Sequence, residues 1–133
     1  MSLTNQQRLL LIANHPQLIY LIQRYAEQSG CHVTCVTSVE LAIDQIKQSS
    51  PAIVMLHLKA WPHDDWHLLR RLKGLRSDTF FPIVVISAMA DEARARAEGA
   101  DHWLWQPVMY ADFQEILVTR GVIPASIGHT PGQ

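Results

Sequence analysis

Charged residues are scarce and balanced in this sequence of 133 residues. They make up 17% of the chain and leave a formal net charge of -1. No run of basic residues is present, so the charge distribution gives no reason to expect binding to nucleic acid or to an anionic membrane. The apolar runs are much shorter than the roughly 20 residues needed to span a bilayer, and the chain does not open on a charged and then apolar leader. We therefore expect a cytoplasmic protein that binds neither nucleic acid nor membrane.

Cysteine is also rare, since the chain has only Cys31 and Cys35. On one strand these residues would lie about 13 Å apart, at about 3.3 Å per residue, which is too far for a disulfide. No second pair completes a zinc-binding pattern. We expect two reduced thiols that fill space on one face of a strand, which also fits the cytoplasm.

The residues that are abundant follow an alternating pattern of strands and helices. Hydrophobic residues make up 48% of the chain, which suits one globular domain with its own core. Apolar runs predict five strands, at residues 8–13, 31–36, 52–58, 82–88 and 101–105. Helical spacing predicts a helix after each strand, at residues 16–29, 39–48, 66–75, 91–98 and 110–120. Such alternation is typical of an α/β fold with a doubly wound parallel sheet.

Three of these elements carry further signals. The strand at residues 31–36 is less apolar than the others, which favours a position at the edge of the sheet. Thr37 is followed three residues later by Glu40, the spacing of a capping box, so we expect the second helix to begin there. The strand at residues 52–58 is the most apolar and ends at His57. Because ligands of such folds bind beyond the carboxyl ends of the strands, His57 marks the candidate site.

Four local motifs give the chain a resemblance to a known family. They are Glu-Gly-Ala-Asp-His-Trp-Leu at 98–104, Gln-Pro at 106–107, Pro-Ile-Val-Val-Ile-Ser-Ala at 82–88 and Asp-Asp-Trp at 64–66. With the alternating pattern, they make the chain resemble the receiver domain of two-component response regulators. The resemblance implies a single flavodoxin-like domain with strand order 2-1-3-4-5. It divides the chain into an arm at 1–7, a receiver-like domain at 8–120 and a tail or linker at 121–133.

The resemblance also implies where phosphoryl chemistry would take place. A receiver accepts a phosphoryl group on an aspartate, beside an acidic pair that holds magnesium, a hydroxyl residue and a lysine. The matching positions here are, in the order of the chain, Ala13, Asn14, His57, Ser87 and Gln106. Only Ser87 keeps the family's residue type. We therefore expect a degenerate phosphoacceptor pocket with no catalytic residue, no metal, no cofactor and no enzymatic activity.

Two other uses of His57 stay open. The imidazole could itself accept a phosphoryl group, which would make the chain an unorthodox but phosphorylatable receiver. Alternatively, it could form hydrogen bonds with Asn14, Ser87 or Gln106 in a pocket that no longer holds metal.

The neighbouring residues leave further alternatives. Asp64 or Asp65 could be a displaced phosphoacceptor, or either could cap the third helix. A soft metal or a small ligand could bind near His57, since imidazole suits zinc and copper and His15 could approach His57 at the strand ends. The histidines that suggest such a sensor are His15, His57, His63 and His67.

Tryptophans mark a possible interaction surface. In the receiver family, the aromatic at the position of Trp103 belongs to the face of the fourth helix, fifth strand and fifth helix, which carries switching and dimerisation. Trp105 would share that face on a regular strand, and Trp61 lies in a loop beside the pocket. Core packing is the alternative for Trp103 and Trp105. We expect a receiver-like signalling module of a two-component phosphorelay that acts by protein–protein interaction, with a homodimer through this face as one form.

Overall fold

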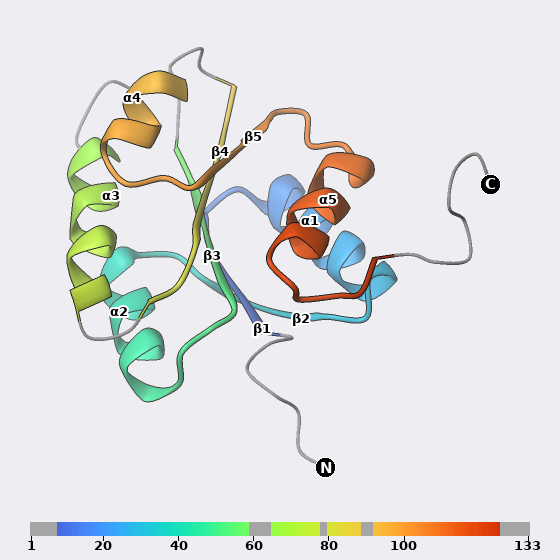
Figure 1. Ribbon diagram of the computed structural model, residues 1–133, viewed down its shortest axis with the longest axis horizontal. Helices are drawn as coiled ribbons and strands as arrows, with labels where there is room; N and C mark the ends of the chain where they lie inside the picture. Colours follow the sequence, from blue (N-terminus) through green and yellow to red (C-terminus); the bar gives the residue numbers. More distant parts are fainter. Residues whose placement is uncertain (1–7, 59–64, 78–79, 89–91, 126–133) are drawn as a thin grey trace.

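The computed structural model describes residues 8–58, 65–77, 80–88 and 92–125. Its five strands form one parallel sheet with the order β2-β1-β3-β4-β5 (Figure 1). The strands are β1 (Arg8–Ile12), β2 (His32–Val36), β3 (Ile53–His57), β4 (Ile83–Ser87) and β5 (His102–Trp105). The helices are α1 (Pro16–Gln28), α2 (Val39–Gln48), α3 (Asp65–Gly74), α4 (Glu92–Ala97) and α5 (Tyr110–Thr119), with a short 3-10 helix, η2 (Leu75–Ser77), after α3. The flavodoxin-like fold and its strand order are therefore confirmed.

Helices cover both faces of the sheet. In Figure 1, α1 and α5 lie on one side, and α2, α3 and α4 lie on the other. The central strand β3 supplies both cores, because successive side chains of a strand point to opposite faces. Ile53 and Met55 pack in the core under α1 and α5, whereas Val54 and Leu56 pack in the core on the opposite face. All four are buried, which explains why this strand is an unbroken apolar run.

The edge position predicted for the second strand is confirmed, since β2 pairs with β1 at one end of the strand order. Cys35 lies on β2, but Cys31 precedes the strand instead of sharing a face with it. Both cysteines are free thiols. Burial raises the pKa of each thiol, so neither is an activated nucleophile.

The predicted capping box at Thr37 and Glu40 is wrong by one residue. The N-cap of α2 is Ser38, whose hydroxyl accepts a hydrogen bond from the backbone N–H of Leu41 at 3.2 Å. Glu40 therefore lies one position too early for the reciprocal bond of a capping box. Its carboxylate instead accepts a hydrogen bond from Arg71 of α3 at 2.8 Å, and this contact lowers the pKa of Glu40.

The packed chain continues a little beyond α5. Gly121 adopts a positive φ of 74°, which lets the chain turn back after the helix. The backbone N–H of Val122 then donates to the carbonyl of Leu117 at 2.9 Å, and the Val122 side chain is buried against the core. None of the helices that the structure describes has the length and apolar character needed to cross a membrane.

Candidate functional site at the carboxyl edge of the sheet

The degenerate pocket predicted from the sequence is made of residues at the ends of four strands. Ala13 follows β1, and Gln106 follows β5. His57 and Ser87 are the last residues of β3 and β4, where His57 pairs with Ile86. Because parallel strands end at the same edge, the fold brings these positions together there, and the backbone N–H of Gln106 donates to the carbonyl of Ser87 at 3.0 Å.

His57 contacts Gln106, the residue that the sequence resemblance matches to the family's lysine. Its Nε2 lies 3.1 Å from Oε1 of Gln106, so the imidazole donates from Nε2 to the amide oxygen. Of the three hydrogen-bond partners considered from the sequence, Gln106 is the one that this contact identifies. The peptide bond between Gln106 and Pro107 is cis.

His15 approaches His57, as the sequence suggested. The two rings meet edge to face, with centroids 5.9 Å apart and an interplanar angle of 75°. However, His15 is also the N-cap of α1, because its Nδ1 accepts a hydrogen bond from the N–H of Leu18 at 3.1 Å. Capping uses one nitrogen of this imidazole, which leaves only Nε2 of His15 for any ligand.

The other strand-end residues differ in their exposure. Ala13 and Ser87 are buried, whereas Asn14 is exposed. The thiol of Cys35 also lies at this edge, with Sγ 3.9 Å from the carbonyl oxygen of Ala13. The sequence did not identify Cys35 as a site residue. Its place at this edge follows from the pairing of β2 with β1, in which Cys35 is the partner of Leu11 near the end of β1.

The donor atoms at this edge are few and without formal negative charge. The strand-end residues that the structure describes offer two amides, a hydroxyl and imidazoles, and no carboxylate. Within the described ranges, no three His, Cys, Asp or Glu residues form a group that could hold a metal ion. His67 is exposed on α3. The loop candidates Trp61, His63 and Asp64 lie outside the described residues, as does the side chain of Asp65.

The tryptophans of β5 lie together but differ in their exposure. Trp103 is only 8% exposed and packs in the core beside α3, whereas Trp105 is 47% exposed. Their ring centroids are 5.4 Å apart. A hollow of about 390 Å³ lies against this strand and is lined by both tryptophans and by residues of α4 and α5.

Comparisons with solved structures identify the fold. The receiver domain of a sensor histidine kinase from Pseudomonas aeruginosa, solved with magnesium in its active-site cleft, has a TM-score of 0.74 and 20% identity, over 86% of this chain and 98% of that one. A two-component response regulator from Clostridium difficile has a TM-score of 0.74 and 18% identity, over 90% and 99% of the two chains. A CheY-like receiver domain from Methylobacillus flagellatus has a TM-score of 0.71 and 19% identity, over 86% and 98%.

Sequence comparisons add nothing to this result, because no family model and no curated protein matches the chain. At identities near 20%, the similarity concerns the fold alone. The chain has the fold of response-regulator receiver domains and spans nearly their whole length.

Proposed function

We propose that this chain is a receiver-like signalling module of a two-component system that is not phosphorylated on an aspartate and acts by protein–protein contact. One observation carries the proposal. The sequence resemblance matches His57 to the acceptor aspartate and Gln106 to the family's lysine, and in the structure these two side chains form a hydrogen bond at 3.1 Å.

Aspartyl phosphorylation needs a carboxylate nucleophile and positive charge to stabilise the phosphoryl oxygens. The side chains at positions 57 and 106 supply neither a carboxylate nor a permanent cation. Of the family's phosphoryl-binding groups, the hydroxyl of Ser87 is retained. One hydroxyl alone gives little support to a transfer that depends mainly on electrostatics and positioning.

Magnesium fits these residues poorly. The cation prefers several hard oxygen ligands, usually including carboxylates. At the end of β1, the chain offers the methyl group of Ala13 and the single amide oxygen of Asn14. The magnesium bound by the receiver domain from Pseudomonas aeruginosa therefore has no equivalent ligand set among the described strand-end residues of this chain.

Contact with a protein partner needs an accessible surface, and β5 offers one. It lies at the opposite edge of the sheet from β2, and Trp105 exposes nearly half of its surface there. A large aromatic beside a hollow is typical of the residues that contribute most to binding energy at interfaces. We assign the contact surface to Trp105 and to the hollow, with Trp103 as its buried support.

The test is phosphorylation by a small acyl phosphate with magnesium, followed by intact-mass measurement. We expect no phosphate adduct, whereas a receiver domain with its aspartate and lysine gains one under the same conditions. A stable adduct on this chain would contradict the proposal. Peptide mapping then distinguishes the alternatives, since phosphate on His57 would indicate an unorthodox receiver and phosphate on Asp64 or Asp65 would indicate a displaced acceptor.

A further inference from the structure

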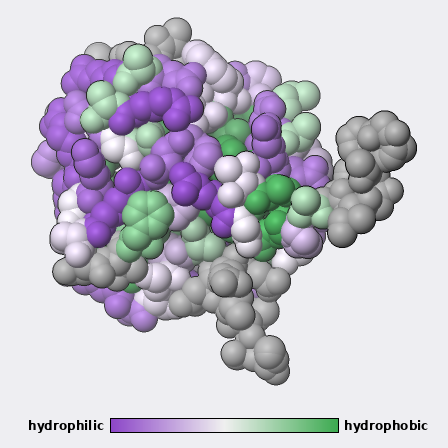
Figure 2. All heavy atoms as spheres, in the orientation of Figure 1, coloured by the Kyte–Doolittle hydropathy of each residue, from purple (hydrophilic) through white to green (hydrophobic). Residues whose placement is uncertain are grey.

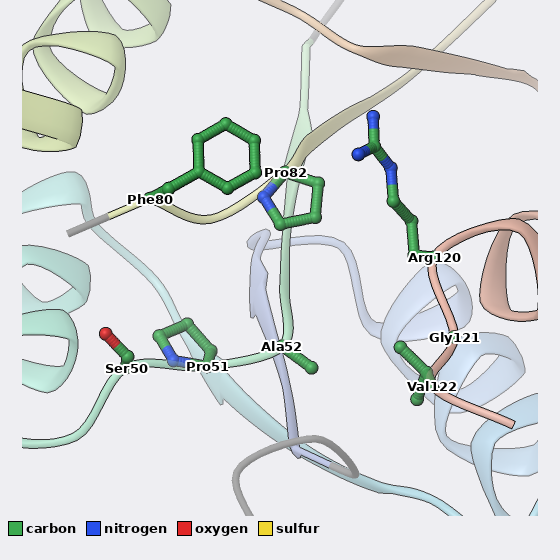
Figure 3. Close-up of a pocket in the computed structure, with 8 residues that line it drawn as sticks. All are labelled: Ser50, Pro51, Ala52, Phe80, Pro82, Arg120, Gly121 and Val122. Carbon is green, nitrogen blue, oxygen red and sulfur yellow. The ribbon is translucent and has the colours of Figure 1, made fainter.

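A second hollow lies at the amino edge of the sheet, away from the residues to which the proposed signalling function is assigned. Its volume is about 360 Å³. It is built from three segments far apart in the sequence: residues 50–52 before β3, residues 80 and 82 before β4, and residues 120–122 after α5 (Figure 3). The five residues of β3, at about 3.3 Å each, separate it from His57 by roughly 16 Å.

The walls of this amino-edge pocket are apolar in part and rigid in part. Pro51 and Pro82 are both buried, and their rings fix the backbone at two sides of the hollow. Val122 is buried, whereas Phe80 is 61% exposed and is the most exposed large hydrophobic residue of the described chain. In Figure 2, an isolated hydrophobic group stands in hydrophilic surface where β4 begins, and more hydrophobic surface gathers beside the end of α5.

Positive charge surrounds these apolar walls. Arg120 lines the pocket itself, and the guanidinium of Arg76 lies 5.0 Å from the centroid of the Phe80 ring. Arg8 lies close by, since it donates a hydrogen bond at 2.6 Å to the hydroxyl of Ser49, next to pocket residue Ser50.

Among the described residues, one carboxylate forms ion pairs within this group of three arginines. Asp101 forms an ion pair with Arg76 and lies 4.0 Å from Arg120. Arg8 has no carboxylate partner in the described chain. The surroundings of the pocket therefore carry more positive than negative charge, and this charge lies beside the apolar side chains of the wall. Such a combination complements an anion with an apolar body.

We propose that this pocket binds a small aromatic carboxylate, with its ring against Phe80 and the two prolines and its carboxylate toward Arg120. The volume lies at the lower end of the roughly 300–1,000 Å³ typical of small-molecule sites, which suits a ligand of one ring. A guanidinium beside an aromatic wall matches both parts of such a ligand. In Figure 3, Pro82 is seen between the Phe80 ring and the Arg120 guanidinium.

The pocket favours a carboxylate over a phosphate because of the helix end beside it. Arg120 is the C-cap of α5, so the helix directs carbonyl groups and the negative end of its dipole toward this region. A phosphate, with its higher charge, gains most at a helix N-terminus, which the pocket lacks in its described lining. A singly charged carboxylate needs only the one guanidinium that the wall provides.

The test is a titration of the isotope-labelled protein with benzoate and, separately, with neutral benzyl alcohol, followed by amide chemical shifts. We expect saturable shifts centred on Ala52 and Gly121 with benzoate at millimolar concentrations, and weaker binding of benzyl alcohol. Arg120→Gln should weaken benzoate binding about five-fold, the upper range for a partly exposed ion pair, and should leave benzyl alcohol unaffected. Inorganic phosphate should not compete.

The chain offers a matched control for the aromatic wall. Tyr20 of α1 is 60% exposed and also carries an arginine against its ring, Arg24 at 5.7 Å, but it lies outside the pocket. Phe80→Ala should weaken benzoate binding, whereas Tyr20→Ala should not. Equal losses in the two variants, equal binding of both probes, shifts centred elsewhere or competition by phosphate would each overturn the proposal. So would the absence of saturable binding.

Discussion

His57 and Gln106 form a hydrogen bond at the carboxyl edge of the sheet. A carboxylate at the end of β3 would attract a divalent cation and would need one to offset its neighbours. Here, the imidazole N–H donates to the amide oxygen of Gln106, and both partly buried groups obtain a hydrogen bond without any cation. The same two residues therefore form a hydrogen bond at the edge of the sheet, and neither of them brings a carboxylate to it.

Titration of His102 should make the stability of the protein change with pH. Its Nε2 accepts a hydrogen bond from Nε of Arg120 at 2.8 Å, which only the unprotonated nitrogen can do. Burial has the largest effect on the pKa of His102 and lowers it. The positive charges of Arg120 and Arg96 lower this pKa further, whereas the negative charge of Asp101 acts in the opposite direction. The unfolded chain therefore binds the proton more readily. The free energy of unfolding should fall as the pH decreases from the unfolded value of about 6.5 to the lower folded pKa.

The measurement is urea unfolding from about pH 7.5 to about pH 5.5, on either side of that unfolded value. In His102→Gln, the amide oxygen can still accept from Arg120 but does not titrate. This variant should lose less stability over the range than the native chain. Parallel curves for the two proteins would show that His102 does not contribute to the pH dependence.

At the scale of elements, the sequence predicted the strands and helices because each buries an apolar face with its own period. Successive residues of β3 alternate between two cores, and α2 repeats its buried residues at helical spacing. Helix ends were less predictable. Both Thr37 and Ser38 have suitable hydroxyls, and Glu40, whose spacing favoured Thr37, pairs instead with Arg71 of α3. No local motif encodes a contact between residues 31 positions apart.

Two glycines at or near helix ends should respond in opposite ways to alanine. Gly30 follows α1 with a φ of 77°, a conformation that costs a residue with a Cβ about 1–2 kcal/mol, although open space surrounds it. Gly74 ends α3 without a positive φ and also faces open space, so alanine gains helix propensity of about 0.5–1 kcal/mol there. We expect Gly30→Ala to lower the free energy of urea unfolding and Gly74→Ala to raise it. Changes of the same sign would contradict this assignment.

At the scale of the molecule, the sequence predicted the edge at which the candidate site lies. Parallel strands must end together, so Ala13, His57, Ser87 and Gln106 had to meet once the strand order was known. The pairing of His57 with Gln106 was one of three possibilities, because side-chain direction depends on the geometry of the loops. The amino-edge pocket could not be predicted, since residues 50–52, 80–82 and 120–122 carry no shared motif and meet only in the fold.

The surface around Trp105 is also suited to join two copies of the chain. The hollow beside this residue has a basic group at Arg96 and acidic groups at Asp112 and Glu115. In a two-fold pair, each surface meets itself, so the acids of one copy can face the arginine of the other. We expect a dimer at high protein concentration in sedimentation velocity.

Removal of the exposed ring should weaken that dimer. Trp105→Ala should raise the dissociation constant about 30-fold, which corresponds to about 2 kcal/mol for an interfacial tryptophan. Tyr20→Ala, which removes an even more exposed aromatic from α1, should leave the constant unchanged. A dimer of unchanged dissociation constant in Trp105→Ala would show that this ring is not part of the contact. A chain that stayed monomeric at every concentration would leave this surface to a different protein partner.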